Sequence, residues 1–170
     1  NYEVKSHQPE VWIWGIDENG KRILIIDRNF PAYFYLLIKE KENPQTVMER
    51  IQIRKEDFPF LVKLEPLERK FFGKPVKAIK VFCQDPDLID KYSKVLKKVE
   101  GVEKCLENDI RYSMRYLIDN DVTPCDWHEM EVEETENELG VQVDGIYLAK
   151  SFPQNVKRTE VPQLRILGFS

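Results

Sequence analysis

The stretch KPVKAIKVFCQDPDLIDKYSKVLKKVEGVEKCLEN, residues 74–108, contains a strand, a helix and a second strand, together with the residues that end them. Its first ten residues alternate apolar side chains with lysines, close to the period of two that predicts a β-strand. Asp85 is an N-cap residue type, Pro86 follows it in the first turn, and Gly101 stands where the helix would end. The stretch therefore predicts a β-α-β order.

The residues before this stretch predict a second β-α-β order. Residues 32–38 predict a strand, Asn43 and Pro44 predict the capped start of the helix that follows, and residues 60–66 predict another strand. Up to Asn108 the order is then β-α-β-β-α-β. This is the order of a ferredoxin-like module, in which two helices cover one face of a four-stranded antiparallel sheet. The expected fold class is α+β.

Hairpins are expected on both sides of this module. Before it, the pair Asn19-Gly20 separates two apolar runs, and a tight hairpin turn there would need positive φ at both residues. After it, residues 109–119 predict a helix and residues 126–149 predict an acidic hairpin. The apolar run at 164–169, LRILGF, predicts one more strand.

Composition indicates a folded protein of moderate size. The chain has 170 residues and is 42% apolar, which is enough for a packed core. No apolar run approaches the roughly 18–20 residues of a membrane helix, and the first residues lack the pattern of a signal peptide. We therefore expect a cytoplasmic protein without a membrane partner.

The charge is distributed unevenly along the chain. The net charge is −4, from 26 basic and 30 acidic residues. Residues 120–145 contain nine acids and no Lys or Arg, so the remainder has 26 basic against 30 − 9 = 21 acidic residues, or +5. A basic body with one acidic segment is compatible with phosphate binding.

Catalytic and metal-binding patterns are missing from the sequence. Three cysteines lack a CxxC pair, two histidines lack a partner at ligand spacing, and no phosphate-binding glycine loop occurs. The alternating Glu129, Glu131 and Glu133 predict a solvated strand face. The third strand of the module, residues 74–82, has aliphatic residues where RNA-recognition modules carry stacking aromatics, so the RNA-binding face is expected to be missing.

The helix over residues 109–119, DIRYSMRYLID, combines an apolar stripe with unusual polar side chains. The stripe, expected to pack on the sheet, is Ile110, Met114, Leu117 and Ile118. The other side would carry the donors and stacking planes that a nucleotide needs. These residues are Arg111, Tyr112, Arg115 and Tyr116. A purely structural amphipathic helix is the alternative.

Three stretches together resemble the N-terminal domain of family B DNA polymerases, especially the archaeal enzymes. They are NGKRILIIDRNFPAYFYLL (19–37), KFFGKPVKAIKVF (70–82) and DIRYSMRYLIDNDVTPCDW (109–127). The resemblance implies an N-terminal, template-binding domain over residues 1–124. Residues 125–170 would hold the acidic hairpin and the start of a 3′–5′ exonuclease domain.

The resemblance also implies a function. The chain would be a fragment of a DNA-directed DNA polymerase, a nucleotidyltransferase of DNA replication, and would bind single-stranded template DNA and the other polymerase and exonuclease domains. This fragment would carry no catalytic residue and no cofactor, whereas the full-length enzyme would need Mg²⁺. Ser170 stands where the resemblance implies the first metal-binding Asp of the exonuclease, and a hydroxyl replaces a carboxylate poorly as a Mg²⁺ ligand.

Archaeal members of the family catch uracil in template DNA, and the resemblance implies a pocket for that base. Its wall would exclude thymine by contact with the thymine methyl group. The matching positions are Ala32, Tyr33, Pro86, Ile89, Arg111, Tyr112 and Arg115. Ala32, Ile89 and Arg111 differ from the family pattern, which leaves uracil sensing a hypothesis. A ferredoxin-like protein-interaction module without DNA binding is the alternative function.

Overall fold

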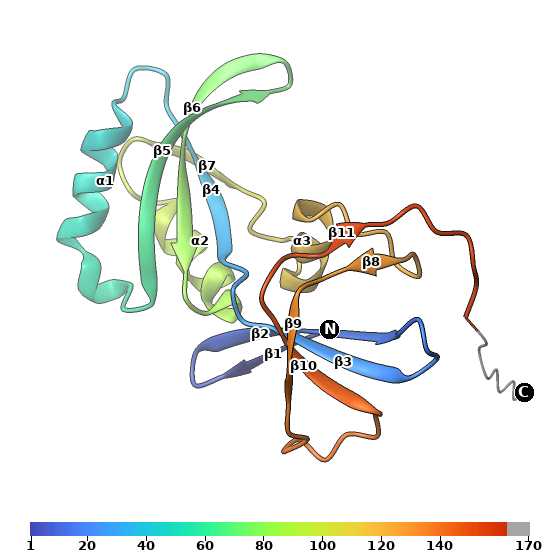
Figure 1. The fold of residues 1–170 in the computed structure, drawn as a ribbon. Helices are drawn as coiled ribbons and strands as arrows, with labels where there is room; N and C mark the ends of the chain where they lie inside the picture. The colour runs from blue at the N-terminus through green and yellow to red at the C-terminus, as the bar shows by residue number, and fades with distance from the viewer. Residues whose placement is uncertain (163–170) are drawn as a thin grey trace, which may run out of the picture. The chain divides into compact units, whose positions relative to one another are not determined.

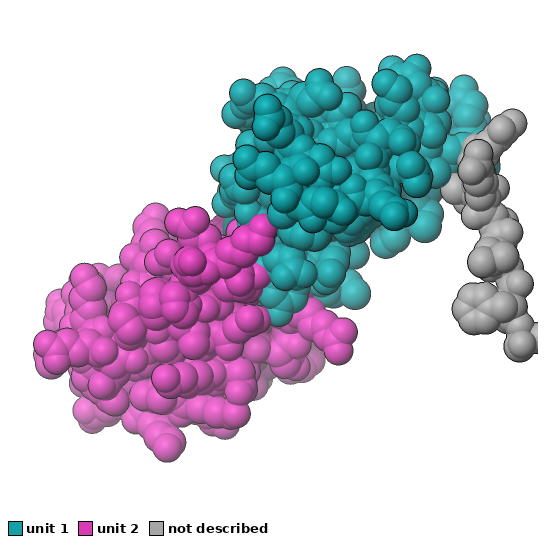
Figure 2. Space-filling model, turned by 90° about the horizontal axis from the view of Figure 1, so that it is seen from below, with its two compact units in different colours: residues 1–3, 10–30, 113–170 teal, residues 4–9, 31–112 magenta. Residues whose placement is uncertain are grey.

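The computed structural model describes residues 1–162 and confirms the α+β fold class, with more strand than helix (Figure 1). The strand predicted at 164–169 lies outside the described residues. The chain forms two compact units (Figure 2). Unit 1 contains residues 1–3, 10–30 and 113–170, and unit 2 contains residues 4–9 and 31–112. Both units use residues before position 124, so the division into 1–124 and 125–170 stays a prediction.

Unit 2 follows the predicted β-α-β-β-α-β order. Its elements are β4 (Ala32–Ile38), α1 (Pro44–Ile53), the 3-10 helix η1 (Lys55–Asp57), β5 (Leu61–Phe71), β6 (Lys74–Cys83), the 3-10 helix η2 (Pro86–Leu88), α2 (Ile89–Leu96) and β7 (Val102–Leu106). The four strands form one sheet in the order β5-β6-β4-β7, and every neighbouring pair is antiparallel. Helix α1 contacts β5 and β6, and α2 contacts β4 and β7.

The predicted caps are confirmed, although Asp85 caps the 3-10 helix η2 and α2 itself begins at Ile89. The Asn43 side chain accepts a hydrogen bond from the Gln45 amide at 2.9 Å, and the Asp85 side chain accepts one from the Asp87 amide at 2.9 Å. Each cap satisfies an amide that has no partner within its helix. Gly101, beyond α2, has φ +93°, and an added Cβ would lie 2.6 Å from Val47 Cγ2 on α1. Glycine is therefore required there by backbone conformation and by space.

The two faces of this sheet differ in chemistry. Leu36 pairs with Ile79 and Cys105, and the Cys105 thiol donates to the carbonyl of Ser93 on α2 at 3.3 Å. This face is therefore the helix-covered one, and its central residues Leu36 and Ile79 are fully buried. Because side chains alternate along a strand, Tyr33 on β4 points to the opposite face. We call that opposite side the open face.

Unit 1 is built on a five-stranded sheet in the order β1-β2-β3-β10-β9. Its strands are β1 (Tyr2–Lys5), β2 (Gln8–Ile16), β3 (Arg22–Asp27), β9 (Val132–Thr135) and β10 (Gly145–Ala149). The predicted first hairpin is confirmed as the antiparallel pair β2–β3. Its turn differs from the expectation, because only Gly20 of the Asn19-Gly20 pair has positive φ. The Asp17 side chain accepts from the amides of Asn19 and Lys21 and closes a longer loop.

The acidic hairpin is confirmed as the antiparallel pair β9–β10, but it is not a separate element. Strand β10 also pairs in parallel with β3, which joins residues 145–148 to 23–26. The short strand β8 (His128–Glu129) leaves the hairpin and pairs with β11 (Gln154–Asn155). The sequence pattern predicted neither arrangement, because neither pairing follows from local periodicity.

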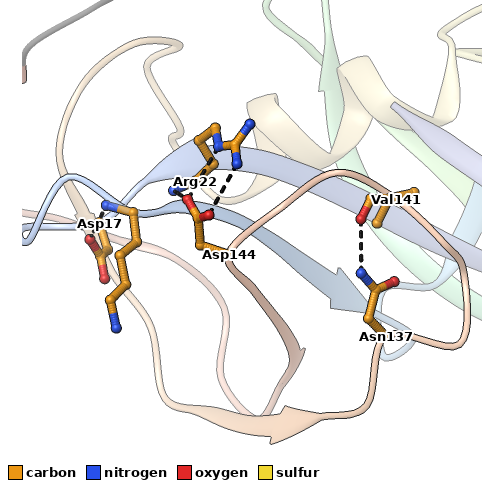
Figure 3. A network of polar contacts seen from close by, with 6 residues as sticks. Asp17, Arg22, Asn137, Val141 and Asp144 are labelled. Carbon is orange, nitrogen blue, oxygen red and sulfur yellow. Dashed lines mark hydrogen bonds and ion pairs between the residues drawn. The ribbon is translucent and has the colours of Figure 1, made fainter.

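One charged pair lies at the start of the parallel β3–β10 ladder (Figure 3). The Arg22 guanidinium donates to both carboxylate oxygens of Asp144, at 3.2 and 3.0 Å. The backbone amide of Arg22 donates to the same carboxylate at 2.8 Å. These hydrogen bonds lower the pKa of Asp144 to about 2. The pair thereby connects two strands that are far apart in the sequence.

Cys83 and Cys105 behave as packing residues, whereas Cys125 is exposed. Cys83 is buried, and burial raises the pKa of its thiol to about 12. Cys105 is half-buried, and burial raises the pKa of its thiol to about 11. Among the described residues, no helix has both the length and the apolar composition needed to cross a membrane.

Candidate nucleic-acid-binding site

Strand pairing brings four of the predicted site residues to one end of the sheet in unit 2. Ala32 begins β4 and pairs with Cys83, the last residue of β6. Pro86 and Ile89 follow that end of β6, in η2 and at the first position of α2. The fourth residue, Tyr33, follows Ala32 on β4. All four residues are buried.

The side chains of these residues do not all share a face. Ala32 is on the helix-covered face, next to α2, which carries Ile89. Tyr33 is on the open face, where the Lys80 ammonium lies 3.6 Å from its ring centre. A pocket that uses Tyr33 and Ile89 together would form around the sheet end rather than on one face.

The cap of η2, which leads into α2, is contacted by a residue that sequence reasoning missed. His7 lies in the turn between β1 and β2, and its Nδ1 is 2.6 Å from the Asp85 carboxylate. The His7 ring stacks on Phe60 with 3.9 Å between the ring centres. The Asp85 carboxylate therefore accepts a hydrogen bond from the Asp87 amide and also contacts His7. No local signal in the sequence links positions 7 and 85.

Helix α3 (Tyr112–Asp119) is confirmed, but its predicted orientation is wrong. Met114 and Ile118, expected to pack on the sheet, are 51% and 62% exposed. Tyr112 and Arg115, expected to face solvent, are both 4% exposed. The helix therefore buries its tyrosines and one arginine and presents apolar side chains outward.

A buried carboxylate explains this orientation. Tyr116 is 1% exposed, and its hydroxyl donates to Asp27 at the end of β3 at 2.9 Å. Asp27 is fully buried, and its other carboxylate oxygen accepts from the Asn29 amide at 2.8 Å. The rings of Tyr116 and Phe30 also pack in a T-shaped arrangement, with 5.0 Å between their centres. Burying Asp27 requires hydrogen-bond donors, so the tyrosine side of the helix is the one that packs inward.

The site residues near α3 belong to both units. Arg111 is exposed and Tyr112 is buried in unit 2, whereas Arg115 lies in unit 1. The predicted roles of these residues in binding DNA stay predictions.

Aromatic side chains occur on the open face, although the expected absence of an RNA-binding face stays a prediction. Phe82 pairs with Tyr33, and Tyr35 pairs with Lys80, so all four side chains lie on that face. The Tyr33 ring centre is 5.6 Å from that of Tyr35 and 5.9 Å from that of Phe82. The signal was present in the sequence, since positions 33 and 35 and positions 80 and 82 keep the period of two. The expectation rested on the third strand alone, residues 74–82, and left out Tyr33 and Tyr35 of the first strand.

The described residues do not fit a metal ion. Within residues 1–162, no group of three or more His, Cys, Asp or Glu side chains is arranged to hold one. The Mg²⁺ that the resemblance implies therefore has no ligand set in this part of the chain, and Ser170 lies outside it.

Known proteins match this chain over most of its length. No family model matches it. DNA polymerase 3 of Saccharolobus shibatae is 29% identical over 168 residues, which are 99% of this chain and 21% of that protein. The DNA polymerase of Pyrococcus horikoshii is 28% identical over 86% of this chain and 11% of that protein.

A solved structure matches the fold as well. The family B DNA polymerase from the hyperthermophilic archaeon Pyrobaculum calidifontis superposes with a TM-score of 0.80 and 30% identity over 96% of this chain. The chain is related to archaeal family B DNA polymerases. It covers 20% of that polymerase chain, so it spans about a fifth of the length of the relatives that match nearly all of it.

Proposed function

We propose that this chain is the template-binding part of a DNA-directed DNA polymerase that acts in cytoplasmic DNA replication. The observation that carries the proposal is the relation to archaeal DNA polymerases over 99% of the chain. In this proposal the chain binds single-stranded template DNA ahead of a polymerase site that lies elsewhere in the parent protein. The other polymerase and exonuclease domains are its partners, and Mg²⁺ belongs to them.

The sheet of unit 2 supports a ferredoxin-like interpretation. The strand order β5-β6-β4-β7, with antiparallel neighbours, is the order expected when two β-α-β halves interleave. Helices α1 and α2 contact different pairs of strands, so together they span the sheet. The opposite face is then the one that neither helix covers.

Uracil recognition at the sheet end is the finer part of the proposal. Ala32, Tyr33, Pro86 and Ile89 are buried at one end of the sheet, so in this proposal they would meet the base as fixed side chains rather than as an adaptable surface. A wall close to the base would accept the hydrogen at position 5 of uracil and reject the thymine methyl. Arg111 is exposed and would bind a phosphate, because a guanidinium offers paired donors. Tyr112 and Arg115 are buried and would brace α3.

The test is a binding titration with two single-stranded oligonucleotides that differ only in one uracil or thymine. We expect fluorescence anisotropy to show binding of both at low salt, weakening as salt rises, with the uracil strand bound more tightly. Arg111→Ala should weaken both complexes. Lys91→Ala, which removes an exposed charge from α2, is the matched control and should leave them unchanged.

The outcomes separate the parts of the proposal. Equal affinities for the two strands would reject uracil sensing and keep template binding. Absence of binding at every salt concentration would reject template binding and favour the protein-interaction module.

A further inference from the structure

We infer that the open face of unit 2 and the tip of its β5–β6 hairpin form a second binding site for single-stranded DNA, which borders the predicted uracil pocket at the buried Tyr33 ring. The inference rests on the proposed function for the choice of DNA. Its residues are Tyr35 and Phe82 as stacking rings, Lys80 and Lys104 as cations, and Phe72 at the hairpin tip.

The rings are arranged as a platform on two adjacent strands. Tyr35 is on β4 and Phe82 is on β6, and both ring centres lie within 6 Å of the buried Tyr33 ring between them. Tyr35 and Phe82 are half-buried, so each residue keeps some exposed surface. β4 and β6 are the first and third strands of the four-stranded module, and sheets of this kind bind bases on aromatics of these two strands.

Cations surround the rings. The Lys80 ammonium lies 3.6 Å from the Tyr33 ring centre and 4.9 Å from that of Phe82, and the Lys63 ammonium lies 5.9 Å from the Phe82 ring centre. Strand register puts Lys104 on the same face, opposite Leu37. Glu65 is the acid opposite Lys80, and it pairs with Lys63. A base can stack while these flexible amines turn to the phosphates, as in other single-strand sites.

The β5–β6 hairpin bends over this face. The Lys104 ammonium, on edge strand β7, lies 4.1 Å from the centre of the Phe71 ring, on the opposite edge strand β5. Such a contact across the width of the sheet requires the end of the hairpin to curve over the open face, as its ribbon does in Figure 1. The face is therefore concave.

The hairpin tip carries an exposed aromatic in a costly conformation. Phe72 and Gly73 form the two-residue turn, with φ +47° and +78°, and Phe72 is 91% exposed. Asn or Gly would form this turn with less strain than a bulky side chain. The flanking Lys70 and Lys74 are exposed cations. An exposed ring between cations is the chemistry that holds a base and its phosphates.

The charge on this surface favours a nucleic acid over a protein. The hairpin from Leu61 to Cys83 contains six Lys or Arg and two Glu residues. Stacking rings among these cations match a flexible polyanion with exposed bases, whereas in a duplex the bases are already stacked. We therefore commit to single-stranded DNA.

The experiment is a titration of the full 170-residue chain with a fluorescent oligothymidylate of about 12 nucleotides, a length within the range of known single-strand sites. Phe72→Ala, Tyr35→Ala and Phe82→Ala should each weaken binding about tenfold, as expected for loss of one stacking plane. The ring-retaining variants Phe72→Tyr, Tyr35→Phe and Phe82→Tyr should bind like the unaltered chain. Lys104→Ala should weaken binding, and Lys91→Ala should not.

Folding is controlled separately. Phe72 is exposed, so Phe72→Ala should keep the circular dichroism spectrum and unfolding midpoint of the unaltered chain. If Tyr35→Ala or Phe82→Ala does not fold, Phe72→Ala and Lys104→Ala still decide the question.

The results distinguish this site from the proposed function. If the unaltered chain binds DNA and the folded alanine variants bind it equally well, the open-face site is wrong and template binding stands. If the chain binds no single-stranded DNA, both are wrong. Tighter binding of the matching duplex, or of oligouridylate RNA, would overturn the choice of ligand. Weaker binding of both strands by the alanine variants, with the preference for the uracil strand retained, would support two sites.

Discussion

Two hairpins of this molecule share an architecture and differ in charge. The β5–β6 hairpin, Leu61 to Cys83, has six basic and two acidic residues, whereas the β9–β10 segment, Val132 to Ala149, has five acidic and no basic residues. A DNA strand would be attracted to the first and repelled by the second. The net charge of −4 hides this separation. A charge summed over the chain is therefore a poor guide to a phosphate-binding surface.

The charged groups of the two hairpins also have different partners. In the acidic segment, Glu133 pairs with Lys150 and Asp144 pairs with Arg22, and each partner lowers the pKa of its carboxylate. In the basic hairpin, the ammonium groups of Lys63 and Lys80 lie over aromatic rings. The acids stabilise the fold locally, whereas the lysines and rings offer a surface to a ligand.

The largest expected effect comes from removing charge at the tip of the basic hairpin. The double variant Lys70→Ala/Lys74→Ala should weaken binding of single-stranded DNA by about tenfold or more. It should also reduce the steepness of log affinity against log salt by about 1.4, because each lysine neutralises one phosphate and a single strand contributes roughly 0.7 per phosphate. Titrations at several salt concentrations measure both quantities. The matched variant Glu134→Gln/Glu136→Gln in the acidic hairpin should leave the slope unchanged. Equal slopes for the two double variants would remove the functional contrast between the hairpins.

A second comparison concerns the buried tyrosine hydroxyls that support the two sheets. In unit 1, Tyr116 donates to the buried Asp27 carboxylate at 2.9 Å, and in unit 2, Tyr92 accepts from the Phe60 amide at 3.2 Å. Tyr116→Phe should cost about 1.5–3 kcal/mol, since the lost hydrogen bond involves a charged group, and Tyr92→Phe about 0.5–1.5 kcal/mol. Urea unfolding of the two variants measures both free energies. A larger loss for Tyr92→Phe would contradict the role given to Asp27 in orienting α3.

The parts of the fold that the sequence predicted are those determined by residues close together in the chain. Asn43 and Asp85 cap their helices because the amide that each satisfies is two residues away. The face of α3 was not predictable by periodicity, because the deciding partner of Tyr116 is Asp27, 89 positions earlier. The periodicity of apolar residues carries no information about a distant buried carboxylate that needs a hydrogen-bond donor. The parallel β3–β10 pair was hidden for the same reason, since Arg22 and Asp144 are 122 positions apart.

In the candidate site, too, some contacts follow from local sequence and others depend on residues far apart in the chain. Tyr33 and Phe82 are cross-strand partners, and their common face follows from strand alternation once the register is known. The register itself comes from the pairing of β4 with β6 across a helix and another strand, which local sequence does not specify. The contact of His7 with Asp85 depends on how the β1–β2 turn reaches η2, and no residue near either position indicates it.

The smallest expected effect concerns the Arg22–Asp144 pair, which tests whether the acidic hairpin is held to β3 by charge. The ordinary pKa of the carboxyl is 3.8, and its pairing with Arg22 lowers the pKa in the folded chain to about 2. A lowered folded pKa means that the pair stabilises the fold fully above pH 3.8 and that this contribution is lost as the pH falls toward 2. Asp144→Asn should therefore unfold at a slightly lower temperature than the unaltered chain at neutral pH, and the difference should shrink in acid. The effect is small because both groups are exposed and solvent screens their attraction. Thermal unfolding of the two chains between neutral pH and pH 2 measures it, with Asp126→Asn as the control for loss of a carboxylate outside this pair. A constant difference across that range would mean that the backbone hydrogen bonds of the ladder, and not the charge of Asp144, hold β10 against β3.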